Sequence, residues 1–413
     1  MLDIEQVRAC FPALASGAVF FDNPGGTQVA QQVIERMNHY FLHANANHGG
    51  AFRTSQESDA IVAEARHAVA DFLNASRPEE IIFGQNMTSL TFHMSRSLAC
   101  RLQPGDEIVV TRLDHDANVA PWLLIAQDRG CSVRWVNFRR EDCTLDMDEL
   151  ERQITPRTKI VAIGYASNAV GTVHDVQRAV QLAHRAGALC YIDAVQYAPH
   201  KPIDVQALDC DFLACSAYKF FGPHTGILYG KYALLDELMA YKVRPSGQLP
   251  PDKFETGTQS FESIAGVLGA VEYLAWVGAT FGQQFASRYQ ERFSGRRLAL
   301  KQAMAAVEAY ELTLNHALLA GLSSIPELHI WGITDRERMH QRVPTFSFTQ
   351  SGKHPTQIAE ALAQQNIYVW DGNFYAYEAE RALGLERQGG FLRIGLTHYN
   401  TPQEIDQLVA ALT

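Results

Sequence analysis

The chain has 413 residues, 47% of them hydrophobic and 19% charged, an ordinary composition for a folded globular protein of two or three structural units. Its net charge is -10, with 35 Lys and Arg against 45 Asp and Glu, and no basic run is long enough to follow a phosphate backbone, so nucleic acid is not an expected partner. No apolar run approaches the roughly 20 residues that span a bilayer, and the N-terminus lacks a basic-then-apolar signal, so a cytoplasmic protein without membrane contact is expected.

Between residues 60 and 230, short β-rich runs alternate with helical patterns. The runs are 81–83, 107–111, 133–136, 159–163, 189–192, 212–215 and 226–229. One of the intervening helices is predicted from Val176 to Arg185, where apolar residues recur at helical spacing. The alternation predicts a mainly parallel sheet wrapped by helices, with ligands at the carboxyl ends of the strands.

After residue 265 the pattern changes to long helices, predicted over 266–277 and 283–321. Sparse elements follow: strands at 345–348, 367–370 and 391–395, a helix over 355–365 and a last helix from Thr401. Helices followed by isolated strands predict a smaller α+β domain. Residues 245–260, rich in Pro, Gly, Ser and Thr, predict an exposed loop.

A lysine and an aspartate stand at the ends of two predicted strands. Lys219 follows the run 212–215, and Asp193 closes the run 189–192, 26 positions earlier. A lysine amine forms a Schiff base with the aldehyde of pyridoxal phosphate, and an aspartate keeps its pyridine nitrogen protonated. Separately, each has a simpler explanation, as a solvated loop lysine or a helix-capping aspartate. Together they predict a pyridoxal phosphate enzyme.

The chain resembles the class V aminotransferase group of fold-type I pyridoxal phosphate enzymes, most closely the cysteine desulfurase and selenocysteine lyase branch. The likeness runs from Phe21-Asp22-Asn23 to Tyr399-Asn400-Thr401. It implies an α/β fold with a mainly parallel seven-stranded sheet, flanking helices and a smaller α+β C-terminal domain. We expect residues 16–280 to form the large cofactor-binding domain, and residues 1–15 with 281–413 to form the small one.

The resemblance assigns the groups around the cofactor ring. It implies that Lys219 forms the Schiff base, that Asp193 pairs with the pyridinium nitrogen, and that His115 stacks on the ring. Asn168 and Gln196 match positions that hydrogen-bond the phenolic oxygen of the cofactor. Both amides, and the imidazole as a cap or core residue, also have purely structural interpretations.

The phosphate is expected where the chain turns from strand into helix at Met87 and Thr88, because free backbone N–H groups and the helix dipole favour an anion there. The resemblance implies further contacts from Ser216 and from Tyr218, which stands where the family more often has histidine. Gly257 and Thr258 match a segment that crosses to the phosphate of a neighbouring subunit. A homodimer with shared active sites is therefore expected.

Arg393 corresponds to the arginine that grips the α-carboxylate of the substrate, which implies a small amino acid substrate. Asn23 falls in a segment that lines the substrate mouth in this family, and Asp371 lies in the aromatic loop around Tyr375, where it would shape a substrate pocket. Both also suit tight turns or packing. They are candidate substrate contacts together with Tyr375.

The chain departs from the family at Tyr375, which stands where true desulfurases place a cysteine that accepts sulfur as a persulfide. None of the seven cysteines lies beyond Cys215, and an unperturbed phenol keeps its proton at neutral pH. The cysteines are odd in number and have no C-x-x-C spacing, which predicts neither disulfides nor a metal site.

The expected function is desulfurase-like carbon–sulfur lyase chemistry at Cβ of an amino acid, without a persulfide on this loop. Proton removal from Cα by Lys219 would begin it. Two alternatives stay open: an aminotransferase or epimerase of a specialised pathway, and a pyridoxal phosphate-binding partner without turnover.

Overall fold

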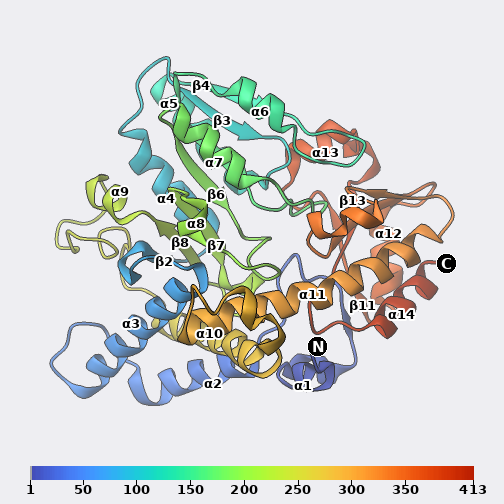
Figure 1. Ribbon diagram of the computed structural model, residues 1–413, viewed down its shortest axis with the longest axis horizontal. Helices are drawn as coiled ribbons and strands as arrows, with labels where there is room; N and C mark the ends of the chain where they lie inside the picture. The colour runs from blue at the N-terminus through green and yellow to red at the C-terminus, as the bar shows by residue number, and fades with distance from the viewer. Residues whose placement is uncertain (1) are drawn as a thin grey trace. The chain divides into compact units, whose positions relative to one another are not determined.

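Figure 1 draws the computed structural model, which describes residues 2–413. These residues divide into two compact units. Unit 1 consists of the N-terminal segment through Ala13, Gln28–Arg101 and Lys201–Ala306. Unit 2 consists of Leu14–Thr27, Leu102–His200 and Val307–Thr413. The predicted boundaries at residues 15 and 280 stay a prediction.

Three antiparallel strands lie in unit 1, in the order β2 (Ile81–Gly84), β8 (Gly226–Gly230) and β7 (Phe212–Ser216). Their residues are almost entirely buried, which explains why they read as continuous apolar runs. Gly226 is the register partner of both Gly84 and Ser216. The ends of the three strands therefore meet at one edge.

Four parallel strands lie in unit 2, in the order β6 (Leu189–Asp193), β5 (Thr158–Gly164), β3 (Glu107–Thr111) and β4 (Ser132–Val136). The strand order of the whole seven-stranded sheet is β2-β8-β7-β6-β5-β3-β4, which confirms the predicted seven-stranded, mainly parallel sheet. The connecting helices of this unit are α5 (Ala120–Arg129), α6 (Met147–Gln153) and α7 (Val176–Arg185). Helix α7 has the predicted bounds.

A second sheet in unit 2 is antiparallel, in the order β12 (Trp370–Gly372), β13 (Phe391–Gly395), β10 (Thr345–Gln350) and β9 (Leu328–Trp331). Helices α12 (Pro355–Ala363) and α14 (Pro402–Leu412) pack on it through the core residues Ile358, Leu362, Ile405 and Leu408 (Figure 1). The predicted strand 367–370 is split: β11 (Ile367–Tyr368) pairs with β1 (Val19–Phe20), and the chain then joins β13 from Trp370.

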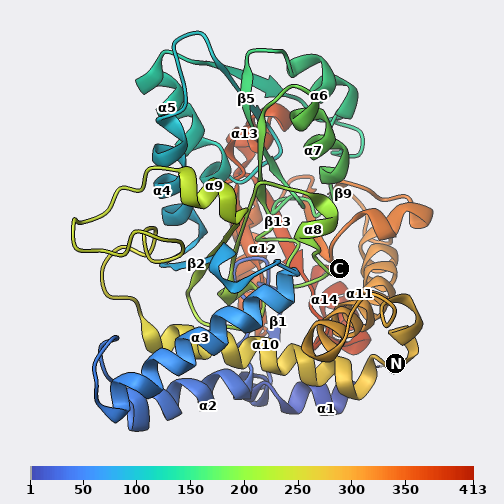
Figure 2. The ribbon, with the colours of Figure 1, turned by 60° about the vertical axis from the view of Figure 1, so that its left-hand side comes forward.

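In unit 1, α2 (Gln31–His39), α3 (Arg53–Leu73) and α10 (Phe261–Phe281) lie side by side (Figure 2). A Cβ on Gly269 would stand 2.5 Å from the carbonyl oxygen of Gln32, so only glycine allows α10 to approach α2 this closely. Helix α10 has the length and apolar composition of a membrane span, which makes the predicted absence of such a run wrong. However, 67% of the most apolar 18-residue stretch of this helix is buried, as in the core helix of a soluble protein.

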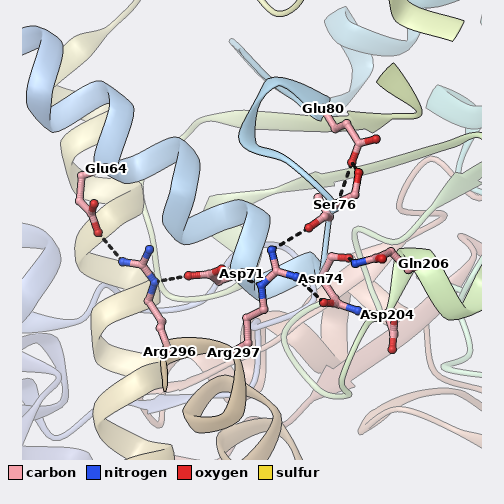
Figure 3. A network of polar contacts seen from close by, with 10 residues as sticks. Glu64, Asp71, Asn74, Ser76, Glu80, Asp204, Gln206, Arg296 and Arg297 are labelled. Atoms are coloured by element: carbon pink, nitrogen blue, oxygen red, sulfur yellow. Dashed lines mark hydrogen bonds and ion pairs between the residues drawn. The ribbon is translucent and has the colours of Figure 1, made fainter. Parts of the chain in front are cut away.

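The predicted helix 283–321 is interrupted. A short 3-10 helix, η6 (Gln283–Arg288), precedes α11 (Gly295–Ser323), and Gly295 has a φ of +55°. Arg296 and Arg297 then stand in the first turn of α11, where the helix dipole disfavours cations. Asp71 of α3 compensates, because its two carboxylate oxygens accept from the Nε atoms of Arg296 at 2.7 Å and Arg297 at 2.8 Å (Figure 3).

The remaining elements are all helices or short helical turns. In unit 1 they are α1 (Ile4–Ala9), η2 (Tyr40–Ala44), η3 (Pro78–Glu80), α4 (Met87–Ala99), α8 (Val205–Leu208), η5 (Ala217–Lys219) and α9 (Tyr232–Glu237). In unit 2 they are η4 (Asp116–Asn118), η7 (Arg336–Gln341), α13 (Tyr377–Leu383) and η8 (Glu386–Gln388). The 3-10 helix η1 (Pro12–Ser16) begins in unit 1 and ends in unit 2.

Glu255 anchors the segment that leads into α10. Arg66 donates to its two oxygens at 2.7 and 3.0 Å, and the backbone N–H of Phe83 donates at 2.8 Å. The Arg66 and Glu255 side chains are only 11% and 9% exposed. We expect Glu255→Gln to lower the free energy of unfolding by roughly 3 kcal/mol, since it leaves a buried guanidinium without its counter-charge.

Chemical denaturation of the wild-type protein and of Glu255→Gln measures this loss of unfolding free energy. Glu57 is the matched control, because its ion pair with Arg53 is exposed, and Glu57→Gln should cost less than about 0.5 kcal/mol. Equal losses for the two variants would contradict the structural role given to Glu255.

Candidate active site

Lys219 lies directly after a buried strand in unit 1. It closes η5, the single 3-10 turn that follows β7, and backbone bonds from Phe220 and Gly222 to the Ala217 carbonyl hold that turn. The Lys219 Nζ atom is 5.0 Å from the centre of the Tyr218 ring, and that ring stacks on His224 with centres 5.0 Å apart. The lysine is thus presented, half-buried, by a fixed turn.

The N-terminus of α4 lies beside the same strand end. The backbone N–H of Met87 donates to the Ser216 hydroxyl at 3.1 Å, and Asn86 caps the helix through the backbone N–H of Ser89 at 2.9 Å. A Cβ on Gly226 would stand 2.4 Å from the carbonyl carbon of Asn86, so glycine is required there. Unit 1 therefore brings together Ser216, Met87 and the first turn of α4, which includes the exposed Thr88.

Gly257 and Thr258 lie between the anchored Glu255 and α10. Both are exposed, and Gly257 has a φ of +74°. Thr258 lines a cavity of about 740 Å³ in unit 1, together with Gln85, Ser89 and His224. The cavity therefore joins this segment to the first turn of α4.

Asp193 ends β6 in unit 2. It is buried, it is the register partner of Gly164 on β5, and one of its carboxylate oxygens accepts the backbone N–H of Val195 at 2.9 Å. Tyr165 donates its backbone N–H to the Asp193 carbonyl at 2.7 Å. The carboxylate is thus held at the carboxyl end of a parallel strand, as the sequence predicted.

A second buried carboxylate, Asp114, lies near Asp193. It accepts from the Thr111 hydroxyl at 2.9 Å, from the Asn118 amide at 2.9 Å and from the backbone N–H of Gly164 at 2.9 and 3.0 Å. Burial, and to a lesser extent the charge of Asp193, raise the pKa of Asp114 to about 7. Asp114 was not predicted from the sequence as a site residue, because an aspartate in this position is typical of a turn.

The raised pKa makes Asp114 a source of pH-dependent stability. Its proton is held more tightly in the folded chain than in the unfolded chain, where the ordinary pKa is 3.8. Its contribution is therefore fully present below pH 3.8 and is lost as pH rises to about 7. We expect Asp114→Asn to flatten the fall in unfolding free energy between pH 4 and pH 7, measured by denaturation, whereas an unchanged slope would contradict it.

Two amides in unit 2 have a buried oxygen that accepts no hydrogen bond from the residues the structure describes. The Gln196 Nε2 atom donates to the Thr345 hydroxyl at 2.9 Å, and the Asn168 Nδ2 atom donates to the Phe374 carbonyl at 2.8 Å. Because the Thr345 hydroxyl can also donate, the Gln196 amide can turn over and present its N–H₂ group instead. Asn168 cannot, since a carbonyl only accepts.

Arg393 is a buried residue of β13. Its Nη1 atom donates to the Asn168 carbonyl at 2.9 Å, and its guanidinium carbon is 4.0 Å from the centre of the Phe374 ring. Burial raises the pKa of the nearby Asp22 to about 6. The positive charge of Arg393 lowers this pKa, but by less than burial raises it. Asp22 was also missed as an individual residue.

His115 and Tyr375 lie against each other in unit 2. Their rings stack with centres 5.4 Å apart and planes inclined by 27°. The His115 Nδ1 atom accepts the backbone N–H of Ala117 at 3.0 Å, which places the imidazole proton on Nε2 when the ring is neutral. Tyr375 itself is 72% exposed.

Asp371 and Asn23 are occupied by bonds within unit 2. Asp371 is adjacent in β12 to Trp370, the register partner of Arg393, so its side chain lies on the opposite face of the sheet and accepts from the Thr356 hydroxyl at 2.6 Å. The Asn23 amide donates to the carbonyl oxygens of Phe20 and Gly395, each at 2.8 Å. Their predicted substrate contacts stay predictions, and the function proposed below does not use them.

The family model described as aminotransferase class-V matches residues 19–300 and 295–408. Aminotransferase-like protein FGM3 of Gibberella zeae is 33% identical over 419 residues, covering 99% of this chain and 97% of that protein. A cysteine desulfurase of Synechococcus elongatus is 33% identical over 429 residues, covering 99% of this chain and 63% of that protein.

Among solved structures, the cysteine desulfurase CsdA of Escherichia coli, in its S-sulfonic acid form, is 30% identical with a TM-score of 0.82, covering 100% of this chain and 98% of that one. The predicted fold and family are thereby confirmed. The chain belongs to the aminotransferase class-V family of pyridoxal phosphate-dependent enzymes, and it is similar to the cysteine desulfurases within that family.

Proposed function

We propose that the chain binds pyridoxal phosphate at Lys219 and catalyses carbon–sulfur bond cleavage at Cβ of a cysteine-like amino acid. The observation that carries the proposal is the convergence in unit 1 of a lysine, a buried serine hydroxyl and a helix N-terminus. An amine and an anion site on neighbouring turns suit a ligand that carries both an aldehyde and a phosphate.

The phosphate fits the donors around α4. Ser216 already accepts from Met87, so its own hydroxyl proton can be donated to an anion, and the helix dipole favours negative charge there. Thr88 would add a second hydroxyl. The Tyr218 phenol, which stands where relatives more often carry histidine, can donate in the same way.

The ring fits the polar groups of unit 2. Asp193 supplies a buried carboxylate for a protonated ring nitrogen, and Gln196 can present its N–H₂ group to a phenolic oxygen without losing its bond to Thr345. Asn168 is a weaker candidate for that oxygen, since its N–H₂ group is bonded to the Phe374 carbonyl. We keep it as part of the support beneath Arg393.

When bound, the cofactor supplies an electron sink for the bonds at Cα. The chain's own residues would do the rest. Arg393 would hold the substrate carboxylate, His115 would stack on the cofactor ring, and the Lys219 amine would take the proton from Cα. Loss of the sulfur substituent from Cβ then needs no thiol on the protein, and water alone completes conversion of cysteine to pyruvate, ammonia and sulfide.

The test is to incubate the purified holoprotein with L-cysteine and to quantify sulfide, pyruvate, ammonia and alanine. Equal amounts of sulfide, pyruvate and ammonia would support the proposal. Sulfide with alanine in the presence of a thiol reductant would point to desulfurase turnover, despite Tyr375. No sulfide would refute carbon–sulfur lyase chemistry on cysteine.

Aminotransfer is the second candidate, because FGM3, a relative that aligns along nearly its whole length, is named aminotransferase-like. It would use the same Lys219, Asp193 and Arg393. Incubation with an amino acid and a 2-oxo acid distinguishes it, since transfer makes a new amino acid and releases no sulfide or ammonia.

We also propose that the active enzyme is a cytoplasmic homodimer. The segment before Thr258 exposes apolar side chains that an isolated subunit would leave in water: Met239, Tyr241, Val243 and Leu249. Light scattering in solution tests this, and a monomer at micromolar concentration would contradict it.

A further inference from the structure

The turn before α13 is strained. Phe374 and Tyr375 have φ values of +56° and +60°, and two consecutive bulky residues in the left-handed region are unusual. Such a backbone persists only where surrounding contacts hold it, and such strain is concentrated at functional sites. The contacts that hold this turn therefore indicate what it serves.

Both strained residues are held through their carbonyl oxygens. The Phe374 carbonyl accepts from the Asn168 amide at 2.8 Å, and the Tyr375 carbonyl accepts the backbone N–H of Asp116 at 2.7 Å. The Asn373 side chain also accepts the backbone N–H of Tyr375 at 3.1 Å. The turn is thus fixed to two segments that are far from it in sequence.

The first of these attachments leads to Arg393. The Asn168 carbonyl accepts from Arg393 while its amide holds Phe374, and the Phe374 ring lies 4.0 Å from the guanidinium carbon. The Phe374 ring is itself held by Phe391 of β13, which stacks with it at 6.2 Å between ring centres. The guanidinium is therefore supported on one face by the ring and along one edge by a carbonyl.

The second attachment leads to His115. Asp116, which binds the Tyr375 carbonyl, directly follows His115, and the Tyr375 ring stacks on the imidazole. The same turn thus contacts the two groups that the proposed function assigns to the substrate carboxylate and to the cofactor ring.

We propose that Phe374 and Tyr375 are positioning residues: Phe374 sets the direction of the Arg393 guanidinium, and Tyr375 sets the plane of the His115 imidazole. This inference rests on the proposed function. Neither role needs a reactive atom, because each depends on the face of an aromatic ring and not on the phenol oxygen of Tyr375.

The experiment compares holoprotein variants by two optical measurements. Titration with glycine, L-alanine and L-cysteine gives an apparent dissociation constant from the visible absorption of the bound cofactor, and visible circular dichroism without amino acid reports the environment of its ring. Phe374→Leu should raise the dissociation constants about thirtyfold, the loss expected for one buried cation–π contact. Tyr375→Ala should change the dichroism and leave those constants within about twofold of the wild-type values.

Two controls separate positioning from general loosening. Tyr375→Phe keeps the stacking face and should match the wild type in both measurements. Tyr377→Ala removes a neighbouring exposed ring, which lies against Arg381, and should also match it. If Phe374→Leu does not fold, Asn168→Ala tests the same support and should raise the dissociation constants similarly.

The inference is overturned if Tyr375→Phe behaves like Tyr375→Ala, because the phenol oxygen would then be the active group. Unchanged dissociation constants in Phe374→Leu, or an unchanged dichroism in Tyr375→Ala, would overturn the corresponding half. The dichroism needs no substrate, so a protein that binds the cofactor and converts no amino acid would refute the lyase function and still decide the role of Tyr375.

Discussion

Replacing Lys219 with alanine should reduce turnover of the amino acid substrate by about 10⁴-fold, the upper range for loss of a positioned acid–base group. The replacement should also remove the visible absorption that depends on a covalent lysine link. Lys219 is the candidate because η5 presents it at the buried end of β7, beside Ser216 and the first turn of α4. Steady-state product formation and an absorption spectrum of the purified variant measure both effects.

Lys353→Ala is the matched control. Lys353 is exposed before α12, and its loss should leave both the rate and the spectrum unchanged. Loss of the base that removes the Cα proton should slow turnover by about 10²–10⁴-fold. A Lys219→Ala protein that keeps more than about a tenth of the wild-type rate would therefore show that another residue is this base.

Replacing Arg393 with lysine should lower kcat/KM by about a hundredfold, mainly through a higher KM. Lysine keeps the positive charge and loses the planar pair of N–H groups that binds a carboxylate at two points. The Phe374 ring and the Asn168 carbonyl are also arranged for a flat guanidinium and not for an ammonium. Initial rates over a range of substrate concentrations measure the change.

Arg381→Lys is the control for this substitution. Arg381 is half-exposed and lies over the Tyr377 ring, so its replacement should leave kcat/KM within about twofold, as for an exposed contact. An Arg393→Lys enzyme with wild-type kcat/KM would mean that charge alone is recognised, and the bidentate clamp would be wrong.

Local patterns were enough to predict the strands of the large sheet, which are short β-rich runs, and the bounds of α7, where apolar residues recur at helical spacing. The predictions were less accurate where a break in an element depends on contacts distant in sequence or on a short interruption. Gly295 and the residues before it separate η6 from α11 although the surrounding sequence favours helix. The strand predicted over 367–370 is split because Ile367–Tyr368 and Trp370–Gly372 pair with different strands.

The site shows the same limit. Lys219 and Asp193 could be found because a strand end and its next residues are close in sequence. The bond from Asn168 to Phe374 joins residues 206 positions apart, and no local pattern reports it. The position of Asp371 on the face away from Arg393 depends on the register of β12, which the sequence did not specify.

The most direct test of the account is to locate the cofactor attachment. The holoprotein is treated with borohydride, which fixes a lysine–aldehyde link as a stable amine, and its peptides are then analysed by mass spectrometry. The account predicts a phosphopyridoxyl group on Lys219 and on no other lysine. Two results would contradict it. One is a phosphopyridoxyl group on a different lysine, and the other is a protein purified with pyridoxal phosphate whose Lys219 carries no phosphopyridoxyl group after reduction.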